Sequence, residues 1–365
     1  MTEAHLPIRL VELLHRIDAL YPTRGELTLG PVTFHGARGA SNDRELILRL
    51  MHERWPTMAP ELIPFAMDAV GNRFCLVRNH IHTDPERLPV VYWMYETSVA
   101  VPIASHFDRF LDWIGLAAEI VVRRGADDAL DISHLRELVL PHLAHLGVER
   151  DFFALTTSPI SPVGSLHLGM LRVDPEAAGS RLVAAQRAKG DERSRDSILH
   201  ARSALKNFPE FFAAAWFLLT FPEGPSRVIG YRDLVRLLPD LPLYYRGDPQ
   251  MPEFIDIPSP SFREIFDLIA SVADPRDAEE DAVLAMILYD DAESADVWLH
   301  TAIEMANTGL VDRAHTAALN AFHIATTMEA RNHVLLFLEE LYEAFGWEWT
   351  LEVVRFEIAR CMKSS

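Results

Sequence analysis

The sequence predicts two domains: an N-terminal α+β domain with a mainly antiparallel sheet, and an all-α, helical-repeat-like C-terminal domain. Three observations predict this. The chain has 365 residues, whereas one domain usually has about 100–200. Residues 62–111 hold consecutive strand-like segments whose turns are too short for parallel crossovers, and then a helix. From residue 176 onward, apolar residues recur with helical spacing. We expect the domains at 1–120 and 176–365, with 121–175 forming a connecting helix and a hairpin or hinge.

Helices are expected at three places in the N-terminal domain. Residues 7–20 carry apolar side chains near one face of a helix. Asn42 or Asp43 can cap a second helix over 44–54. A third helix begins after Ser105. The apolar residues expected to face inward are Ile8, Val11, Leu14, Ile17 and Leu20 in the first helix, Leu46, Leu50 and Met51 in the second, and Phe107, Phe110, Leu111 and Ile114 in the third.

Strands are expected between these helices. Residues 27–41 indicate one or two short strands, because glycines mark turns within them. An apolar strand beginning at Leu62 is followed by a turn at Gly71-Asn72, a second strand through 74–76 and a third over 90–95. In the third strand, period-2 alternation places Trp93 and Tyr95 on one face and Tyr92 on the other. These aromatic residues suit either core packing or an interface on an exposed sheet face.

The C-terminal half has the apolar spacing of paired helices. In residues 295–328, Trp298 is a bulky anchor and Ala302 is a small packing residue. Gly309 then marks a turn, and Ala314 and Ala321 are small residues that allow close helix contact. This pattern resembles one tetratricopeptide-type helix pair, whose period is about 34 residues. A weaker copy spans 178–211, with Ala201, Ala204 and Pro209 in its second helix. A further helix carries Val334, Leu335, Leu338, Leu341, Tyr342 and Phe345 on its apolar face.

Composition and charge exclude several functional classes. Hydrophobic residues make up 49% of the chain, which is enough for real cores, but no window approaches the roughly 18 uninterrupted apolar residues of a membrane span. The first 20 residues lack the pattern of a signal peptide, so we expect a cytoplasmic protein. The formal net charge is −19, and 38 of the 53 acidic residues follow residue 119. Such a surface disfavours nucleic acid and anionic membranes and favours basic protein partners.

No constellation of residues in the sequence predicts catalysis, a cofactor or a metal. His80 and His82 would share one face of an extended segment, but no third ligand accompanies them. The two cysteines, Cys75 and Cys361, cannot form a disulfide framework. Other candidates lack the spacing of a zincin, a nucleophile elbow or an EF-hand; these are His134, His142 and His145, Ser165, and the acidic residues at 277–281 and 290–293. A hydrolase or metal enzyme therefore remains only a third alternative.

The N-terminal strand pattern resembles a known family. The residues that carry the resemblance are Leu62-Ile63-Pro64-Phe65-Ala66, Asp68, Gly71-Asn72, Phe74-Cys75-Leu76, Pro89-Val90-Val91-Tyr92-Trp93, Glu96, Ile103-Ala104-Ser105, Phe107, Phe110 and Leu111, with Phe34-His35-Gly36 in an earlier strand. They are similar to those of the SUKH superfamily, which includes fungal cell-wall-assembly regulators and many bacterial immunity proteins. The resemblance implies a non-enzymatic α+β module that binds other proteins.

The resemblance and the charge together lead to one functional hypothesis and one alternative. The hypothesis is an immunity protein that occludes a cognate toxin, since an acidic surface suits a basic toxin domain. The alternative is a regulatory scaffold that uses the helical repeats and the α+β domain to bring proteins together. Four residues beside turns or on the aromatic strand are predicted to bind the partner: Asp68, Asn72, Tyr92 and Glu96.

Overall fold

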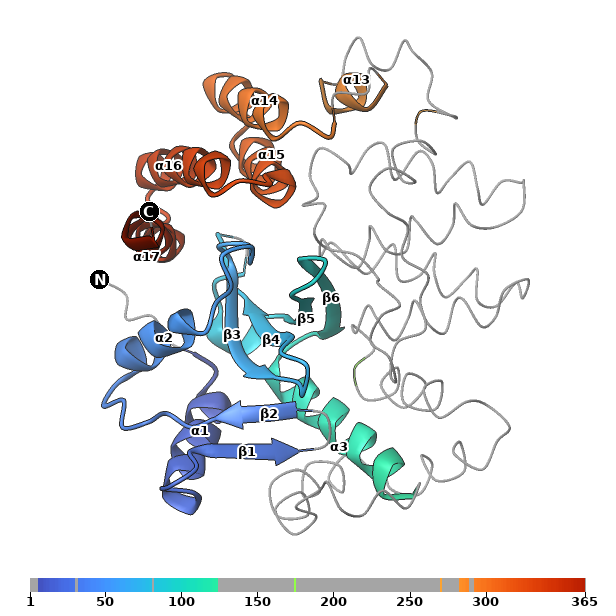
Figure 1. The fold of residues 1–365 in the computed structure, drawn as a ribbon, viewed down its shortest axis with the longest axis vertical. Helices are drawn as coiled ribbons and strands as arrows, with labels where there is room; N and C mark the ends of the chain where they lie inside the picture. Colours follow the sequence, from blue (N-terminus) through green and yellow to red (C-terminus); the bar gives the residue numbers. More distant parts are fainter. Residues whose placement is uncertain are drawn as a thin grey trace, which may run out of the picture. The chain divides into compact units, whose positions relative to one another are not determined.

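A computed structural model provides the structure of the chain and describes residues 6–29, 32–80, 82–123, 174, 270, 282–288 and 292–364. The chain divides into two compact units. The six strands and the helices of the N-terminal region lie in the first unit, and the described C-terminal helices lie in the second (Figure 1). The α+β and all-α classes expected for the two regions are confirmed for the described residues. The boundaries at 120 and 176 stay predictions.

The first unit contains a six-stranded antiparallel sheet in which every strand pairs with its neighbour in sequence, in the order β1-β2-β3-β4-β5-β6. The strands are β1 (Glu26–Leu29), β2 (Val32–His35), β3 (Leu62–Met67), β4 (Arg73–Val77), β5 (Val90–Met94) and β6 (Val99–Ala104). The region for which the sequence predicts one or two short strands therefore contains two, β1 and β2, which pair with each other. The sixth strand, β6, follows the aromatic strand directly and precedes the third helix.

Three helices and a short 3-10 turn complete the first unit. They are α1 (Ile8–Leu20), α2 (Asp43–His52), α3 (Phe107–Arg123) and η1 (Pro85–Arg87). Asn42 is the N-cap of α2, since its side chain accepts a hydrogen bond from the Glu45 amide at 3.0 Å. The Glu45 carboxylate in turn accepts from the Ser41 amide at 2.8 Å, so two amide donors at the helix start are satisfied.

The buried face of α1 differs from the expected one. The helix buries Leu10, Leu13, Leu14 and Ile17, a spacing of i, i+3, i+4 and i+7. Ile8 and Leu20 lie instead at the exposed ends of the helix, at 63% and 41% exposure. The expectation for these two residues was wrong because the buried stripe is shifted around the helix axis. In α2, the inward residues Leu46, Leu50 and Met51 are confirmed as buried.

An aromatic cluster joins α3 to the sheet. Phe110 is fully buried, and its ring centroid lies 5.3 Å from those of both Phe65 on β3 and Phe74 on β4. It also contacts Phe34 on β2 at 6.4 Å and stacks on Trp113 one turn later at 5.8 Å. Rings at such separations contribute beyond their buried area. Phe110 is therefore the residue through which α3 holds three strands together.

The second unit contains helices separated by short turns. They are α13 (Ala282–Leu288), α14 (Ala295–Asn307), α15 (Val311–Ile324), α16 (Met328–Phe345) and α17 (Glu348–Ser364). α14 packs on α15, and the small residues Ala302, Ala314 and Ala321 are fully buried. Gly309 makes the turn between them at φ +81°, a conformation that favours glycine. The helix pair is confirmed, whereas its membership in a repeat family stays a prediction.

Several expectations for the C-terminal half can be compared with the structure. On α16, Val334, Leu335, Leu338, Leu341 and Tyr342 are buried as expected, but Phe345 is 49% exposed. It lies in the last turn before Gly346, whose left-handed conformation (φ +67°) ends the helix. The weaker repeat at 178–211, the histidines at 134, 142 and 145, Ser165 and the acidic segment 277–281 lie outside the described residues. Within the described part of the chain, no helix is long and apolar enough to span a membrane.

Replacing Phe110 with alanine should lower the free energy of unfolding by about 3–5 kcal/mol, since the change leaves a cavity among the aromatic rings that Phe110 contacts. Urea denaturation followed by circular dichroism measures the effect. Leu48→Ala is the matched control, because Leu48 lies on α2 with 44% exposure and its truncation should change stability by about 0.5 kcal/mol or less. Equal effects of the two substitutions would contradict the central role of Phe110.

Candidate functional site

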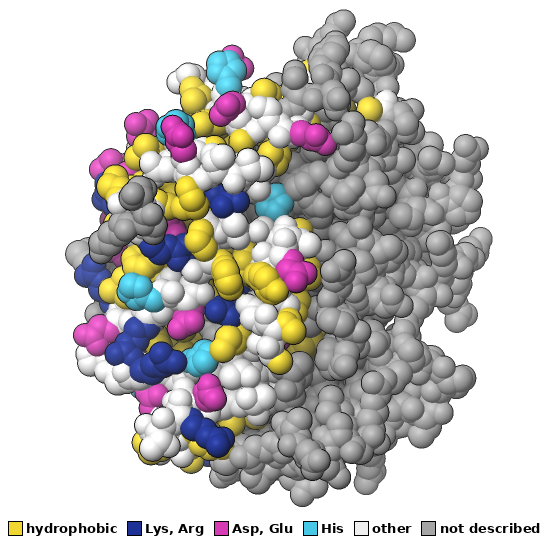
Figure 2. Space-filling view, viewed as in Figure 1, with side chains coloured by type: hydrophobic (Ala, Val, Ile, Leu, Met, Phe, Trp, Pro, Cys, Tyr) yellow, Lys and Arg dark blue, Asp and Glu magenta, His cyan; other side chains and the backbone are white. Residues whose placement is uncertain are grey.

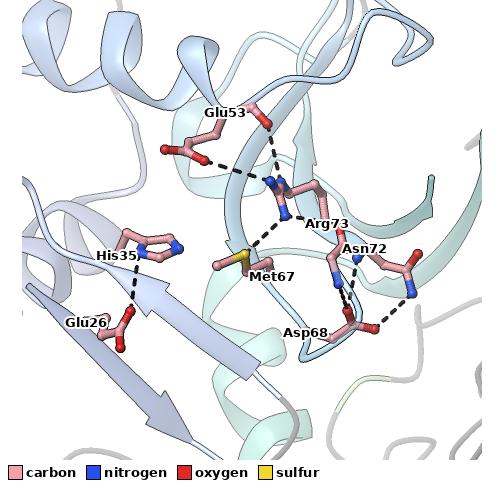
Figure 3. A network of polar contacts seen from close by, with 8 residues as sticks. Glu26, His35, Glu53, Met67, Asp68, Asn72 and Arg73 are labelled. Atoms are coloured by element: carbon pink, nitrogen blue, oxygen red, sulfur yellow. Dashed lines mark hydrogen bonds and ion pairs between the residues drawn. The ribbon is translucent and has the colours of Figure 1, made fainter. Parts of the chain in front are cut away.

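The turn between β3 and β4 is organised by the carboxylate of Asp68. Its Oδ1 accepts hydrogen bonds from the amides of Val70, Gly71 and Asn72 at 3.0, 2.8 and 2.9 Å. Figure 3 shows Asp68 facing Asn72 in this turn. A side-chain oxygen that accepts from the following amides replaces backbone acceptors in a tight turn. Gly71 has φ +100°, which explains why a glycine suits this position. The predicted turn at Gly71-Asn72 is confirmed.

The same carboxylate reaches across the sheet to β5. Asp68 Oδ2 accepts from the Asn72 amide nitrogen Nδ2 at 2.9 Å and from the Tyr92 hydroxyl at 2.6 Å. Asn72 Nδ2 also donates to the Tyr92 hydroxyl at 2.6 Å. Burial first, and then the hydrogen bond to Asp68, raise the pKa of Tyr92 above its usual value. The tyrosine therefore stays a hydroxyl donor at any physiological pH.

The polar network of Asp68, Asn72 and Tyr92 also fixes the chain just beyond β5. Asn72 Oδ1 accepts a hydrogen bond from the Tyr95 amide at 3.2 Å. Asn72 and Tyr92 are only 7% and 1% exposed, so in this arrangement they hold the two turns together and leave little surface for a partner. The structure thus brings three of the four predicted residues into one network. Their part in partner binding stays a prediction.

Arg73 ties the segment after α2 to the start of β4. Its Nε donates to the Glu53 carbonyl at 3.3 Å, and its guanidinium lies 3.8 Å from the Glu53 carboxylate (Figure 3). Its Nη1 donates to the Gly71 carbonyl at 2.9 Å. Arg73 is mostly buried, with 12% of its side chain exposed. This cation is therefore engaged inside the fold and holds Glu53 next to the β3–β4 turn.

Two exposed aromatic rings stack beside this network. Trp55, two residues after Glu53, and Tyr95, directly after β5, have ring centroids 5.6 Å apart and an interplanar angle of 21°. They are 41% and 36% exposed. The Tyr95 hydroxyl donates to the exposed Glu96 carboxylate at 3.0 Å. Trp55, Tyr95 and Glu96 are called the aromatic surface below.

The structure corrects the expected faces of the aromatic strand. All five residues of β5 are buried, so Tyr92 and Trp93 are core residues although they point to opposite faces of the sheet. Tyr95 lies beyond the strand end and is exposed, so it does not share a buried face with Trp93. Trp55 was missed because it lies outside any periodic segment, and sequence spacing does not pair it with a residue 40 positions later.

Two of the remaining ionisable candidates that the structure describes, Cys75 and His82, lie in environments that disfavour reaction. Burial raises the pKa of the Cys75 thiol to about 12, so the reactive thiolate is scarce at neutral pH. Burial, and then the neighbouring His80, lower the pKa of His82 to about 4. Within the described residues, no group of three or more His, Cys, Asp and Glu side chains could hold a metal ion. On the face shown in Figure 2, acidic, basic and apolar side chains are interspersed over the described part.

Tyr92→Phe removes the hydroxyl that joins β5 to the Asp68 carboxylate. It should lower the free energy of unfolding by about 1–3 kcal/mol, because the hydrogen bond to a charged, partly buried acceptor is lost. Chemical denaturation measures this difference. Tyr95→Phe removes an exposed hydroxyl and serves as the control, with an expected change near zero. A Tyr92→Phe variant as stable as the Tyr95→Phe variant would show that the network does not stabilise the fold.

His82 should make the stability depend on pH between about 4 and 6.5. In this window the unfolded chain protonates the histidine at its ordinary pKa of 6.5, whereas the folded chain keeps it neutral down to about 4. Stability from this site is therefore complete above pH 6.5 and falls as the pH drops, by up to about 1.4 kcal/mol per pH unit. His82→Gln should flatten the pH dependence of the free energy of unfolding, and the exposed His15→Gln should not.

One family model matches the chain, and it covers the part just described. The model of the SMI1 / KNR4 family (SUKH-1) matches residues 3–113, which include α1, α2, all six strands and the first turns of α3. No curated protein and no solved structure matches the chain. The match contains every residue of the polar network and of the aromatic surface. The N-terminal domain of this chain is therefore a SUKH domain of the SMI1 / KNR4 family.

Proposed function

We propose that the chain is a non-enzymatic protein-binding module, namely a bacterial immunity protein that neutralises a cognate toxin by occluding it. The observation that carries the proposal is the SUKH domain at residues 3–113, because modules of this superfamily bind proteins and commonly act as immunity proteins. The protein would act in the cytoplasm, without a cofactor, and its partner would be a protein with a basic toxin domain.

The chemistry of the described residues supports a binding role. Occlusion needs a rigid surface and no reactive group, and the Cys75 thiol and His82 imidazole both have pKa values unsuited to reaction at neutral pH. The net charge of −19 would accelerate encounter with a cationic partner and disfavour nucleic acid. Stacked exposed aromatic rings at the end of the sheet are of the residue types that dominate binding energy at interfaces.

A regulatory scaffold is the second candidate. The observation that favours it is the separate compact unit containing α14–α17, since paired helices of this kind can offer a binding surface of their own. Pull-down with each unit separately distinguishes the two functions. A scaffold should retrieve different proteins with the two units, whereas an immunity protein should retrieve one toxin.

Co-expression with the toxin encoded beside the gene tests the main proposal. The full chain should restore growth, and the two proteins should elute together in gel filtration, because neutralisation by occlusion requires a stable complex. The same toxin expressed without the chain provides the control for toxicity. Full toxicity in the presence of the chain, together with separate elution, would overturn the proposal.

A further inference from the structure

We propose that the aromatic surface formed by Trp55, Tyr95 and Glu96 binds an arginine side chain on a basic protein partner. The inference rests on the proposed function for the existence of a protein partner, and it names the surface and the chemistry of recognition. An arginine guanidinium would stack on the aromatic faces and donate hydrogen bonds to the Glu96 carboxylate. Both interactions are typical of arginine, whose planar group combines stacking with paired donors.

The exposure of the two rings is the first observation behind the proposal. Trp55 is 41% exposed, whereas every other tryptophan that the structure describes is buried or only partly exposed. A single exposed apolar residue is ordinary on a protein surface. Here, however, two large rings from separate segments stack on one another at 5.6 Å while both stay accessible. Such a pair offers a broad aromatic platform that the fold itself does not cover.

The rigid mounting of the pair is the second observation. The Tyr95 amide donates to Asn72 Oδ1 at 3.2 Å, which connects the tyrosine to the polar network of Asp68, Asn72 and Tyr92. The segment that carries Trp55 is held through Arg73, which donates to the Glu53 carbonyl at 3.3 Å. The rings therefore lose little conformational freedom when a partner binds. Preorganisation of this kind raises affinity by lowering the entropic cost of association.

The charge around the rings selects a cation. The Glu96 carboxylate is exposed and lies 3.0 Å from the Tyr95 hydroxyl, so it is placed to accept from a group that stacks on Tyr95. Glu53 adds a second carboxylate, 41% exposed, two residues before Trp55. Arg73, the cation that pairs with Glu53, has 12% of its side chain exposed and is occupied by internal contacts. A guanidinium supplied by a partner complements this arrangement.

A peptide titration on the full chain tests the surface directly. The probe is a short glycine-spaced peptide with three arginines, and its counterpart carries three citrullines, which keep the shape and remove the charge. The arginine peptide should shift the indole N–H signal of Trp55 and bind at least about tenfold more tightly than the citrulline peptide, a ratio within the range of desolvated cation–aromatic contacts. A lysine peptide should bind more weakly than the arginine peptide, and a glutamate peptide should not bind.

Substitutions then locate the binding. Trp55→Ala should abolish binding of the arginine peptide, and the isosteric Glu96→Gln should weaken it about three- to tenfold. Phe345→Ala is the matched control, since Phe345 is an exposed aromatic residue (49%) outside the SUKH domain; this variant should bind like the original chain. Circular dichroism verifies that each variant is folded. No binding by the arginine peptide at millimolar concentration, equal binding of the citrulline peptide, or unchanged binding in both substituted chains would overturn the proposal.

The toxin co-expression assay separates this inference from the function on which it rests. The double variant Trp55→Ala, Tyr95→Ala should fail to protect cells, whereas Phe345→Ala should protect them. Full protection by the double variant would overturn the aromatic surface and leave the immunity function standing. Failure of the unaltered chain to protect would overturn the immunity function, and the peptide titration would then decide on the aromatic surface alone.

Discussion

The Asp68 carboxylate is the constraint on which the candidate site depends. It accepts five hydrogen bonds, three from amides of its own turn and two from the side chains of Asn72 and Tyr92. Hydrogen bonds to both of its oxygens spare this partly buried carboxylate the penalty of an unpaired polar group. Through Asn72 it also positions the backbone of Tyr95. One acidic side chain thus determines the shape of two turns at the same end of the sheet.

The structure separates the residues that build this end of the sheet from those that a partner can reach. The supporting residues are mostly buried and form hydrogen bonds within the fold; they are Asn72, Tyr92 and Arg73. The accessible residues are exposed to solvent; they are Trp55, Tyr95 and Glu96. Rigid support beneath a few exposed aromatic residues is a general requirement for strong interface contacts. At this end of the sheet the buried residues preserve the fold, and the exposed ones are those proposed to contact a partner.

Sequence reasoning located much of the domain because its signals are local. The start of α2 at Asn42 or Asp43, the turn at Gly71-Asn72 and the antiparallel order follow from neighbouring residues and short connections, and the structure shows Asn42 to be the cap. The buried face of α1 shows where this reasoning fails, since the stripe that packs is shifted around the helix axis and leaves Ile8 and Leu20 exposed. Phe345 fails for a different reason, because it lies on the apolar face of α16 but in the last, exposed turn of that helix. Periodicity indicates a face, and packing decides how far along it burial extends.

By itself, the sequence determined the fold class, the SUKH resemblance, the acidic charge and the residues at the turns, because each of these depends on composition or on residues close together in the chain. Only the tertiary structure decided that Asp68, Asn72 and Tyr92 form one polar network and that Trp55 stacks on Tyr95. These contacts join residues 4 to 40 positions apart. The physical reason is that sheet pairing and the contacts of Arg73 bring the segments together, and no local pattern encodes which distant side chains then meet.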